Sequence, residues 1–476
     1  MRPPETAPVR RDCAPVGGNP TSVRHNRASL WCNGAPSQRN GAPSQCNGAP
    51  LWRNGAPSQC NGAPLQARLV VAFLIAAGPA GLGAQVMNQM AHHADSARRL
   101  SLGIMAVGVA SRATPGALGT DVTEGYLTQP MLFAGAQTRN RRLQALATIN
   151  FEGLTLARGE INLGVYGEGF SDRRHPHTYA HELMLGALGS SGFGTQGSLF
   201  AGKGFVPFGS DDPMTRPFVK YPVNHHHAQI LERVLVVGAL HARGVSLEAA
   251  RFNGDEPEHP KDWPNSTRAL DSWTARLTIK PREGLEFSGS AARLISPEFA
   301  AGGGLDQNKH SATARFVRAR GPLRYALVEW ARTQETRTAR TFFEFSSVLA
   351  EGQAAVGPWR LSLRLERTER PEEDRLTNPY RSARPLLDFS ILGVTRWDVV
   401  TMHADTPAAR WRWFSATPFV EGAWLRPRAL ARPTAIDPEV FFGASRLWML
   451  SAGVRMHGGD MRTRFGRYGA ALVPAR

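Results

Sequence analysis

The stretch Trp359-Arg-Leu-Ser-Leu-Arg-Leu-Glu366 places a large apolar residue at every second position and fills the positions between with Arg, Ser, Arg and Glu. Successive side chains of a β-strand point to opposite faces, so this stretch predicts a strand with one apolar and one polar face. The same period of two recurs at 143–151, 272–280 and 285–291. These segments predict an all-β fold.

Weaker forms of this alternation fill most of the chain from residue 99 to residue 476 and bring the candidate strands to about seventeen. They lie at 102–112, 126–137, 159–169, 178–189, 196–206, 228–240, 243–253, 310–319, 322–333, 339–350, 385–399, 409–424 and 445–457. Turn signals such as Pro281-Arg-Glu-Gly284 and Gly357-Pro358 alternate with long polar loops, at 206–227, 254–269, 296–309, 369–384 and 425–443. Strands of about ten residues joined alternately by short turns and long loops are typical of antiparallel transmembrane β-barrels.

A soluble β-sandwich also alternates, but two features favour lipid outside and water inside. Aromatic residues stand at strand ends, for example Trp273, Trp359 and Trp448, as in the girdles at both lipid interfaces. Many residues of the polar face are charged, and the lumen-facing candidates are Arg142, Glu152, Arg276, Glu286, Arg315, Arg360, Arg364, Glu366 and Arg455. About 370 residues at about 23 per strand and connection give about sixteen strands, enough to enclose an aqueous channel.

Composition narrows the remaining classes. The 476 residues carry a formal charge of +17, and the basic residues are almost all Arg because Lys occurs only at 203, 220, 261, 280 and 309. Scattered, lysine-poor charge argues against a nucleic-acid-binding tract. All four cysteines lie at or before Cys60, so neither a disulfide framework nor a Cys-ligated zinc site is expected in the rest of the chain. No apolar run is long enough for a transmembrane helix.

The first 98 residues divide into three parts. Residues 1–67 carry an Asn-Gly-Ala-Pro heptad repeat whose Gly and Pro exclude a coiled coil, so we expect disorder or a mis-assigned gene start. Residues 68–84 combine a charged start, an apolar centre and small residues at the end, which predicts a secretory signal peptide cleaved before Gln85. A polar tail with Met and His covers 85–98, and the barrel is expected over 99–476.

Three stretches carry a resemblance to known proteins. They are Asp172-Arg-Arg-His-Pro-His-Thr-Tyr-Ala-His-Glu-Leu-Met-Leu185, Asp211-Asp-Pro213 with His225-His-His227, and Arg251-Phe-Asn-Gly-Asp-Glu-Pro257 leading to Leu270-Asp-Ser-Trp-Thr-Ala-Arg-Leu277. Over roughly residues 99–330 the chain resembles a family of uncharacterised bacterial outer-membrane, porin-like β-barrel proteins. The resemblance implies fold and location, and no activity. Relatives often carry a Met/His-rich segment that looks like a copper-handling tail, to which Met87, Met90, His92 and His93 correspond here.

Two groups of histidines are candidate metal ligands. His175, His177 and His181 share parity, so on an unbroken strand three imidazoles project from one face, a donor set that suits Zn or Cu. The alternative is a set of histidines tolerated at the headgroup level. His225, His226 and His227 are sequential and converge only if they lie in a loop; the alternative is a solvated loop.

The sequence favours a porin-like outer-membrane protein that allows passive diffusion of small hydrophilic solutes, with outer-membrane lipid as its surroundings and no nucleic-acid partner. One alternative is a surface barrel that binds or handles copper or zinc, and a second is a hydrolase built on the barrel wall. The sequence contains no nucleophile elbow, zinc-protease histidine pair or phosphate loop. We therefore predict that the chain is not an enzyme and has no cofactor, with bound copper or zinc as the alternative.

Overall fold

The computed structural model describes residues 99–115, 119, 121–155, 177–191, 194–257, 260–263, 265–373, 391–430, 437–462 and 464–473. The predicted repeat region, signal peptide and polar tail lie outside these residues, as do the candidate strand at 159–169 and His175. The predictions on them stay predictions.

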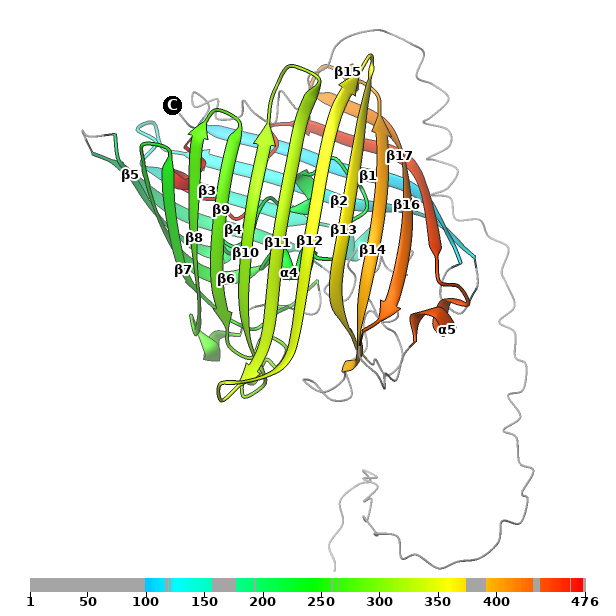
Figure 1. Cartoon of the computed structure of the whole chain (residues 1–476). Coiled ribbons are helices and arrows are strands. Elements are labelled where there is room, and N and C mark those ends of the chain that lie inside the picture. Colours follow the sequence, from blue (N-terminus) through cyan, green and yellow to red (C-terminus); the bar gives the residue numbers. More distant parts are fainter. Residues whose placement is uncertain are drawn as a thin grey trace, which may run out of the picture. The chain divides into compact units, whose positions relative to one another are not determined.

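Sixteen antiparallel strands form one closed sheet, as the sequence predicted (Figure 1). Each strand pairs with its neighbours in chain order, and pairing of Gly103 to Thr114 with Gly459 to Trp448 closes the ring between the first and last strands. A short additional strand, β15, pairs with β16. The strands are β1 Leu100–Thr114, β2 Val122–Gln137, β3 Leu143–Asn150, β4 Ala180–Ser190, β5 Gln196–Gly204, β6 Arg233–Ala242, β7 Val245–Phe252, β8 Ser272–Arg282, β9 Leu285–Leu294, β10 Asp306–Val317, β11 Leu323–Arg337, β12 Arg340–Val356, β13 Trp359–Glu373, β14 Ile391–Asp405, β15 Ala409–Trp411, β16 Phe414–Ala429 and β17 Leu447–Gly459.

The connections differ between the two ends of the barrel. At one end, turns such as 243–244, 283–284 and 357–358 join neighbouring strands directly. At the other end the connections are long, as at 205–232 and 253–271, although β11 and β12 are joined there by a tight turn. We call these the short-turn end and the long-loop end. The predicted alternation of short and long connections is present, and it fixes an antiparallel up-and-down topology.

The two faces of the wall match the alternation of the sequence. On β13, Leu361, Leu363 and Leu365 are 44%, 43% and 49% exposed on the outer face. Ser362 and Arg364, which lie between them, are buried on the inner face. Because neighbouring strands keep this parity in register, the outside of the ring is apolar and the inside is polar. A soluble sandwich has the opposite arrangement.

Short helices lie in the connections: α3 Glu152–Thr155, α4 His225–Ala228 and α5 Pro438–Phe442. None of the helices in the described ranges has the length and apolar character needed to cross a membrane. The strand predicted over 228–240 begins only at Arg233, because residues 225–228 form α4.

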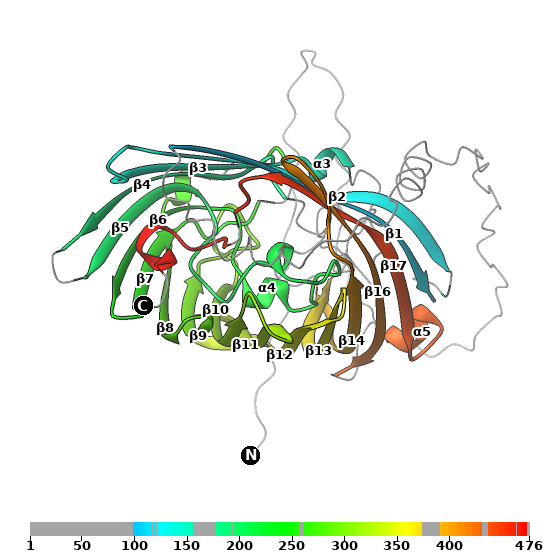
Figure 2. The same cartoon turned by 90° about the horizontal axis from the view of Figure 1, so that it is seen from above.

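Two stretches of chain lie inside the ring. We call residues 205–232, which join β5 to β6, the inner segment, and the described residues 460–462 and 464–473 the C-terminal tail. Figure 2 shows α4 of the inner segment within the ring and the tail running from β17 across the interior toward β7. Apolar side chains of both stretches pack on inward residues of the wall, for example Phe208 and Tyr468 with Leu235. The polar loop predicted at 206–227 is therefore part of the interior.

Candidate functional site

The inner segment is almost wholly buried between opposite sides of the wall. Early in this segment, Gly209 adopts φ 66, and an added Cβ there would lie 1.7 Å from the carbonyl oxygen of Ala228. No other residue type fits this approach. Asp212 then caps a short 3-10 turn by accepting a hydrogen bond from the backbone N–H of Met214 at 2.8 Å. These local signals fold the segment back on itself inside the barrel.

Carboxylates of the wall hold the backbone of this segment. Glu421 on β16 accepts hydrogen bonds from the N–H groups of Val219 at 2.8 Å and Lys220 at 2.7 Å. Glu366 on β13 accepts one from the N–H of Val223. Buried carboxylates thus satisfy backbone donors that have no strand partner there.

Arg216 is the main side-chain anchor of the segment. Its guanidinium lies 3.2 Å from Glu329 on β11 and 3.2 Å from Glu351 on β12, and all three side chains are buried. Burial opposes the charge of Arg216, but the two carboxylates outweigh it and raise its pKa. Ser210 donates a further hydrogen bond to Glu329. The result is a buried ion network that spans two strands.

The C-terminal tail is held by its own arginines. Arg462 pairs with Glu182 on β4, and Arg467 lies 2.6 Å from Glu286 on β9. Arg464 pairs with the same Glu286 at 2.9 Å and with Asp211 of the inner segment. Asp211 therefore links the two inner stretches.

A histidine cluster lies where the inner segment ends. Nδ1 of His181 on β4 is hydrogen-bonded to Oε1 of Glu232, the last residue of the segment, and Nδ1 of His177 lies 3.4 Å from the same oxygen. Burial opposes protonation of His177, but the hydrogen bond to Glu232 and the charge of Glu152 raise its pKa to about 10. Burial raises the pKa of Glu232, yet the two histidines lower it overall. The cluster is thus a buried group of interacting charged side chains.

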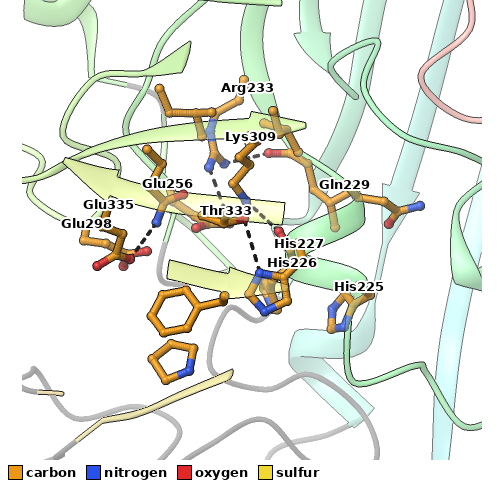
Figure 3. A pocket seen from close by; sticks show the side chains of 16 residues that line it. His225, His226, His227, Gln229, Arg233, Glu256, Glu298, Lys309, Thr333 and Glu335 are labelled. Atoms are coloured by element: carbon orange, nitrogen blue, oxygen red, sulfur yellow. Dashed lines mark hydrogen bonds and ion pairs between the residues drawn. The ribbon is translucent and has the colours of Figure 1, made fainter. Parts of the chain in front are cut away.

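A cavity of about 50 Å³ lies between the inner segment and the wall near the long-loop end (Figure 3). His225, His226 and His227 line one side of it. Lys309 donates a hydrogen bond to the carbonyl of His226 at 2.6 Å, and a ring nitrogen of His227 lies 3.2 Å from the hydroxyl of Thr333. The three carboxylates that line the cavity are Glu256, Glu298 and Glu335. The potential metal-ligand group among the described residues contains His177 and His181 but none of this histidine run, so the two predicted groups are not brought together into one ligand set.

A second cavity of about 20 Å³ lies near the short-turn end. Arg216, Arg360 and Arg455 line it together with His403 and Asp405. Arg360 pairs with Asp405 across β13 and β14. The cavity near the long-loop end is thus lined by three carboxylates together with Arg233 and Lys309, and the cavity near the short-turn end by three arginines together with Asp405.

The structure places the lumen-facing candidates as follows. Arg142 is exposed in the turn before β3, outside the interior. Glu152, expected on a strand, begins α3 and lies 3.8 Å from His177. The others lie inside the ring: Arg276 pairs with Glu248, Glu286 with the tail, Arg315 with Asp211, Arg360 with Asp405, Arg364 with Glu351, Glu366 with the backbone of Val223, and Arg455 with the carbonyls of Pro217 and Phe218.

Sequence reasoning missed Arg216, Glu232 and the three tail arginines. The alternation along the strands could have identified Glu329 and Glu421 as lumen-facing residues, because both stand at inward positions of their strands. No comparable signal existed for Arg216, because it lies in the stretch 206–227 that reads as a polar loop. Glu232 was expected on the strand predicted over 228–240, with no sign of a ligand role.

No protein-family model matches the chain. No curated protein matches it. Porins and outer-membrane channels are among the solved structures to which it is similar. An anion-selective porin from Comamonas acidovorans is 10% identical, with a TM-score of 0.45, over 76% of this chain and 99% of that one. The outer-membrane channel DcaP of Acinetobacter baumannii is 10% identical, with a TM-score of 0.44, over 76% and 96%. OmpT, an outer membrane protein of Vibrio cholerae, is 9% identical, with a TM-score of 0.44, over 76% and 100%. At these values nothing about the activity of this chain is inferred from them.

Proposed function

We propose that the chain is an outer-membrane β-barrel that lets small hydrophilic solutes cross by passive diffusion, along a polar path narrowed by the inner segment and the C-terminal tail. The observation that carries the proposal is the division of the wall into an apolar outer face and a charged inner face. An exposed apolar belt around a closed sheet is stable in lipid, and buried charges are retained where solutes and water must be accommodated. The proposal contains no chemical step.

The size of the cavities sets the expected flux. A water molecule occupies about 30 Å³ in the liquid, so cavities of about 50 and 20 Å³ hold at most a few waters. A larger solute passes only when side chains of the inner segment or the tail move aside. We therefore expect a small and fluctuating conductance, unlike that of an unobstructed sixteen-stranded channel.

The charges beside the two cavities predict how ions are selected. Glu335 lines the cavity near the long-loop end and favours cations there, whereas Arg360 lines the cavity near the short-turn end and favours anions. Removal of the Glu335 charge therefore shifts the selectivity toward anions, and removal of the Arg360 charge shifts it toward cations.

The test is a planar-bilayer recording on the purified protein under a salt gradient. We expect small unitary currents for the wild type, a shift of the reversal potential toward anions for Glu335→Gln, and a shift toward cations for Arg360→Gln. Glu344→Gln is the matched control, because Glu344 is exposed and paired with Arg332 away from both cavities. Folded protein that passes no current, or variants that leave selectivity unchanged, would refute the proposal.

A further inference from the structure

His177, His181 and Glu232 form the one group of three or more potential metal-ligating side chains found within the described ranges. Each offers one ligand atom, and these atoms lie within 4.8 Å of one another. The Nδ1 atoms of both histidines face the same carboxylate oxygen. Donors of a tetrahedral zinc ion lie about 3.3 Å apart, and the 3.4 Å between His177 and Glu232 matches this separation. His181, whose Nδ1 is hydrogen-bonded to the same oxygen, has to move back from it to admit an ion.

The cluster also holds polar atoms that the protein does not satisfy. The Nε2 atoms of His177 and His181 are buried and have no hydrogen-bond partner among the residues described. The two side chains are 7% and 0% exposed, so bulk water does not compensate. Buried polar atoms without partners are rare and point to an unseen ligand or to a change in ring orientation when a ligand binds.

The surroundings resemble the outer shell of a metal site. Glu152 lies 3.8 Å from Nε2 of His177, on the side of the ring opposite Glu232. It is held by Thr128 at 2.7 Å, by the N–H of Gln129 at 2.8 Å and by Asn150 at 3.2 Å. A carboxylate behind a ligating imidazole fixes its orientation and increases its basicity.

Three parts of the chain meet at this cluster. Phe205, the first residue of the inner segment, packs edge-on against His181 with ring centroids 4.7 Å apart, and Glu232 is the last residue of that segment. Phe465 of the tail lies 6.3 Å from the same ring. Glu232 also adopts φ 55, a conformation that residues other than glycine rarely take. Backbone strain is thus tolerated in order to aim this carboxylate at the histidines.

We propose that His177, His181 and Glu232 bind one divalent transition-metal ion of the zinc class, with Glu152 as the carboxylate that orients His177. Two imidazoles and one carboxylate suit zinc, and they leave a fourth position for water. Because Glu232 belongs to the inner segment and His181 to β4, the ion ties the end of that segment to the wall. The site does not depend on the barrel being a channel.

The test measures zinc binding by the full chain in detergent, without a histidine tag. His92 and His93 are first changed to Asn, so that the polar tail contributes no ligand. We expect one zinc per chain by titration calorimetry and elemental analysis. His181→Asn and Glu232→Gln abolish binding, and Glu152→Gln weakens it about 10- to 100-fold. His310→Asn and Glu344→Gln, both on exposed positions, are the matched controls and keep full affinity.

Heat-dependent electrophoretic mobility shows which variants have folded barrels. X-ray absorption of the zinc-loaded protein with intact ligands supplies a measurement that needs no folding-sensitive variant, and two imidazole ligands are expected. Absence of zinc binding, binding that His181→Asn and Glu232→Gln leave unchanged, or a spectrum without imidazole would each overturn the site. Zinc binding by a protein that passes no current refutes only the proposed passage, and currents without zinc binding refute only the metal site.

Discussion

The inner segment and the C-terminal tail fill the same barrel but differ in the kind of contact that predominates. The inner segment is held largely by its backbone, since Glu421 and Glu366 accept hydrogen bonds from its N–H groups and Arg364 donates to the carbonyl of Lys220 at 2.6 Å. The tail is held mainly by its side chains, since Arg462, Arg464 and Arg467 each reach a carboxylate. Its backbone is also bound, because Lys280 of the wall donates to the carbonyls of Ala471 and Val473. In both regions the wall supplies buried negative charge.

This difference predicts which region is displaced first when a solute enters the barrel. The inner segment is joined covalently to β5 and β6, and hydrogen bonds to its backbone fix the course of the chain itself. The tail continues from β17 and is held chiefly by arginine side chains. Single donors from Arg276 and Lys280 bind its carbonyls at Gly466, Ala471 and Val473. We therefore expect that a solute displaces the tail more readily than the inner segment. Variants that remove one anchor from each region test the contrast.

The largest effect is expected at Arg216. Arg216→Met leaves Glu329 and Glu351 buried without their shared partner, and removal of one member of a buried ion pair lowers the free energy of unfolding by about 3–5 kcal/mol. Urea unfolding of the barrel in lipid vesicles, followed by tryptophan fluorescence, measures the loss.

Arg293→Met is the control for Arg216→Met. Arg293 pairs with Asp306 at 2.9 Å, but its side chain is 52% exposed, and such surface pairs contribute about 0–1 kcal/mol. Equal losses in the two variants would contradict the view that Arg216 anchors the inner segment.

The wall was predictable from sequence and the contents of the barrel were not. Strand alternation depends only on neighbouring residues, so the period of two around Leu361 and Leu363 identifies both the strand and the exposed apolar outer face. The inner segment has no period, and charged residues such as Asp211 and Lys220 read as solvated. Its inward course depends on carboxylates from strands more than a hundred residues away in sequence, and no local pattern reveals them.

The histidine cluster also has a part that local sequence could predict and a part that it could not. Parity predicted that His177 and His181 project from one face of an unbroken strand. The two rings do lie close, with centroids 4.7 Å apart, but β4 begins only at Ala180, so His177 precedes the strand. Their partner Glu232 was not predicted, because it lies fifty-one positions after His181 and was expected on the separate strand predicted over 228–240. The sequence also did not reveal that His225, His226 and His227 lie outside the cluster, because this follows from the position of α4 inside the ring.

A smaller, pH-dependent effect is expected at Lys220 of the inner segment. Burial, and then the charge of Arg364, lower the pKa of its ammonium to about 8, although Glu366 and Glu421 oppose the shift. The unfolded lysine keeps its usual pKa of about 10.4. Between these values the unfolded chain binds more protons than the folded chain, so stability rises with pH.

Relative to Lys220→Met, the wild type should therefore gain about 2 kcal/mol in free energy of unfolding between pH 7 and pH 10. The measurement is a pair of urea titrations at the two pH values. Lys261→Met, at an exposed loop position, is the control and should show no such gain. A pH-independent difference for Lys220→Met would indicate that this lysine is solvated and that the inner segment is packed less tightly than its contacts imply.

The smallest effect compares a tyrosine of the tail with a wall tyrosine that contacts Glu351, a partner of Arg216 of the inner segment. Tyr468 of the tail donates to Glu182 at 3.0 Å and accepts from the N–H of Phe205 at 3.0 Å, whereas Tyr325 on β11 donates to Glu351 at 2.9 Å. Tyr468→Phe leaves a buried backbone donor without a partner, and Tyr325→Phe leaves Glu351 with two arginines. We expect the unfolding free energy to fall by about 1–2 kcal/mol for Tyr468→Phe. The fall for Tyr325→Phe should be smaller than that for Tyr468→Phe by about 1 kcal/mol. The reverse order, measured by the same urea titration, would mean that the tail is the more loosely held region even at its most buried contact.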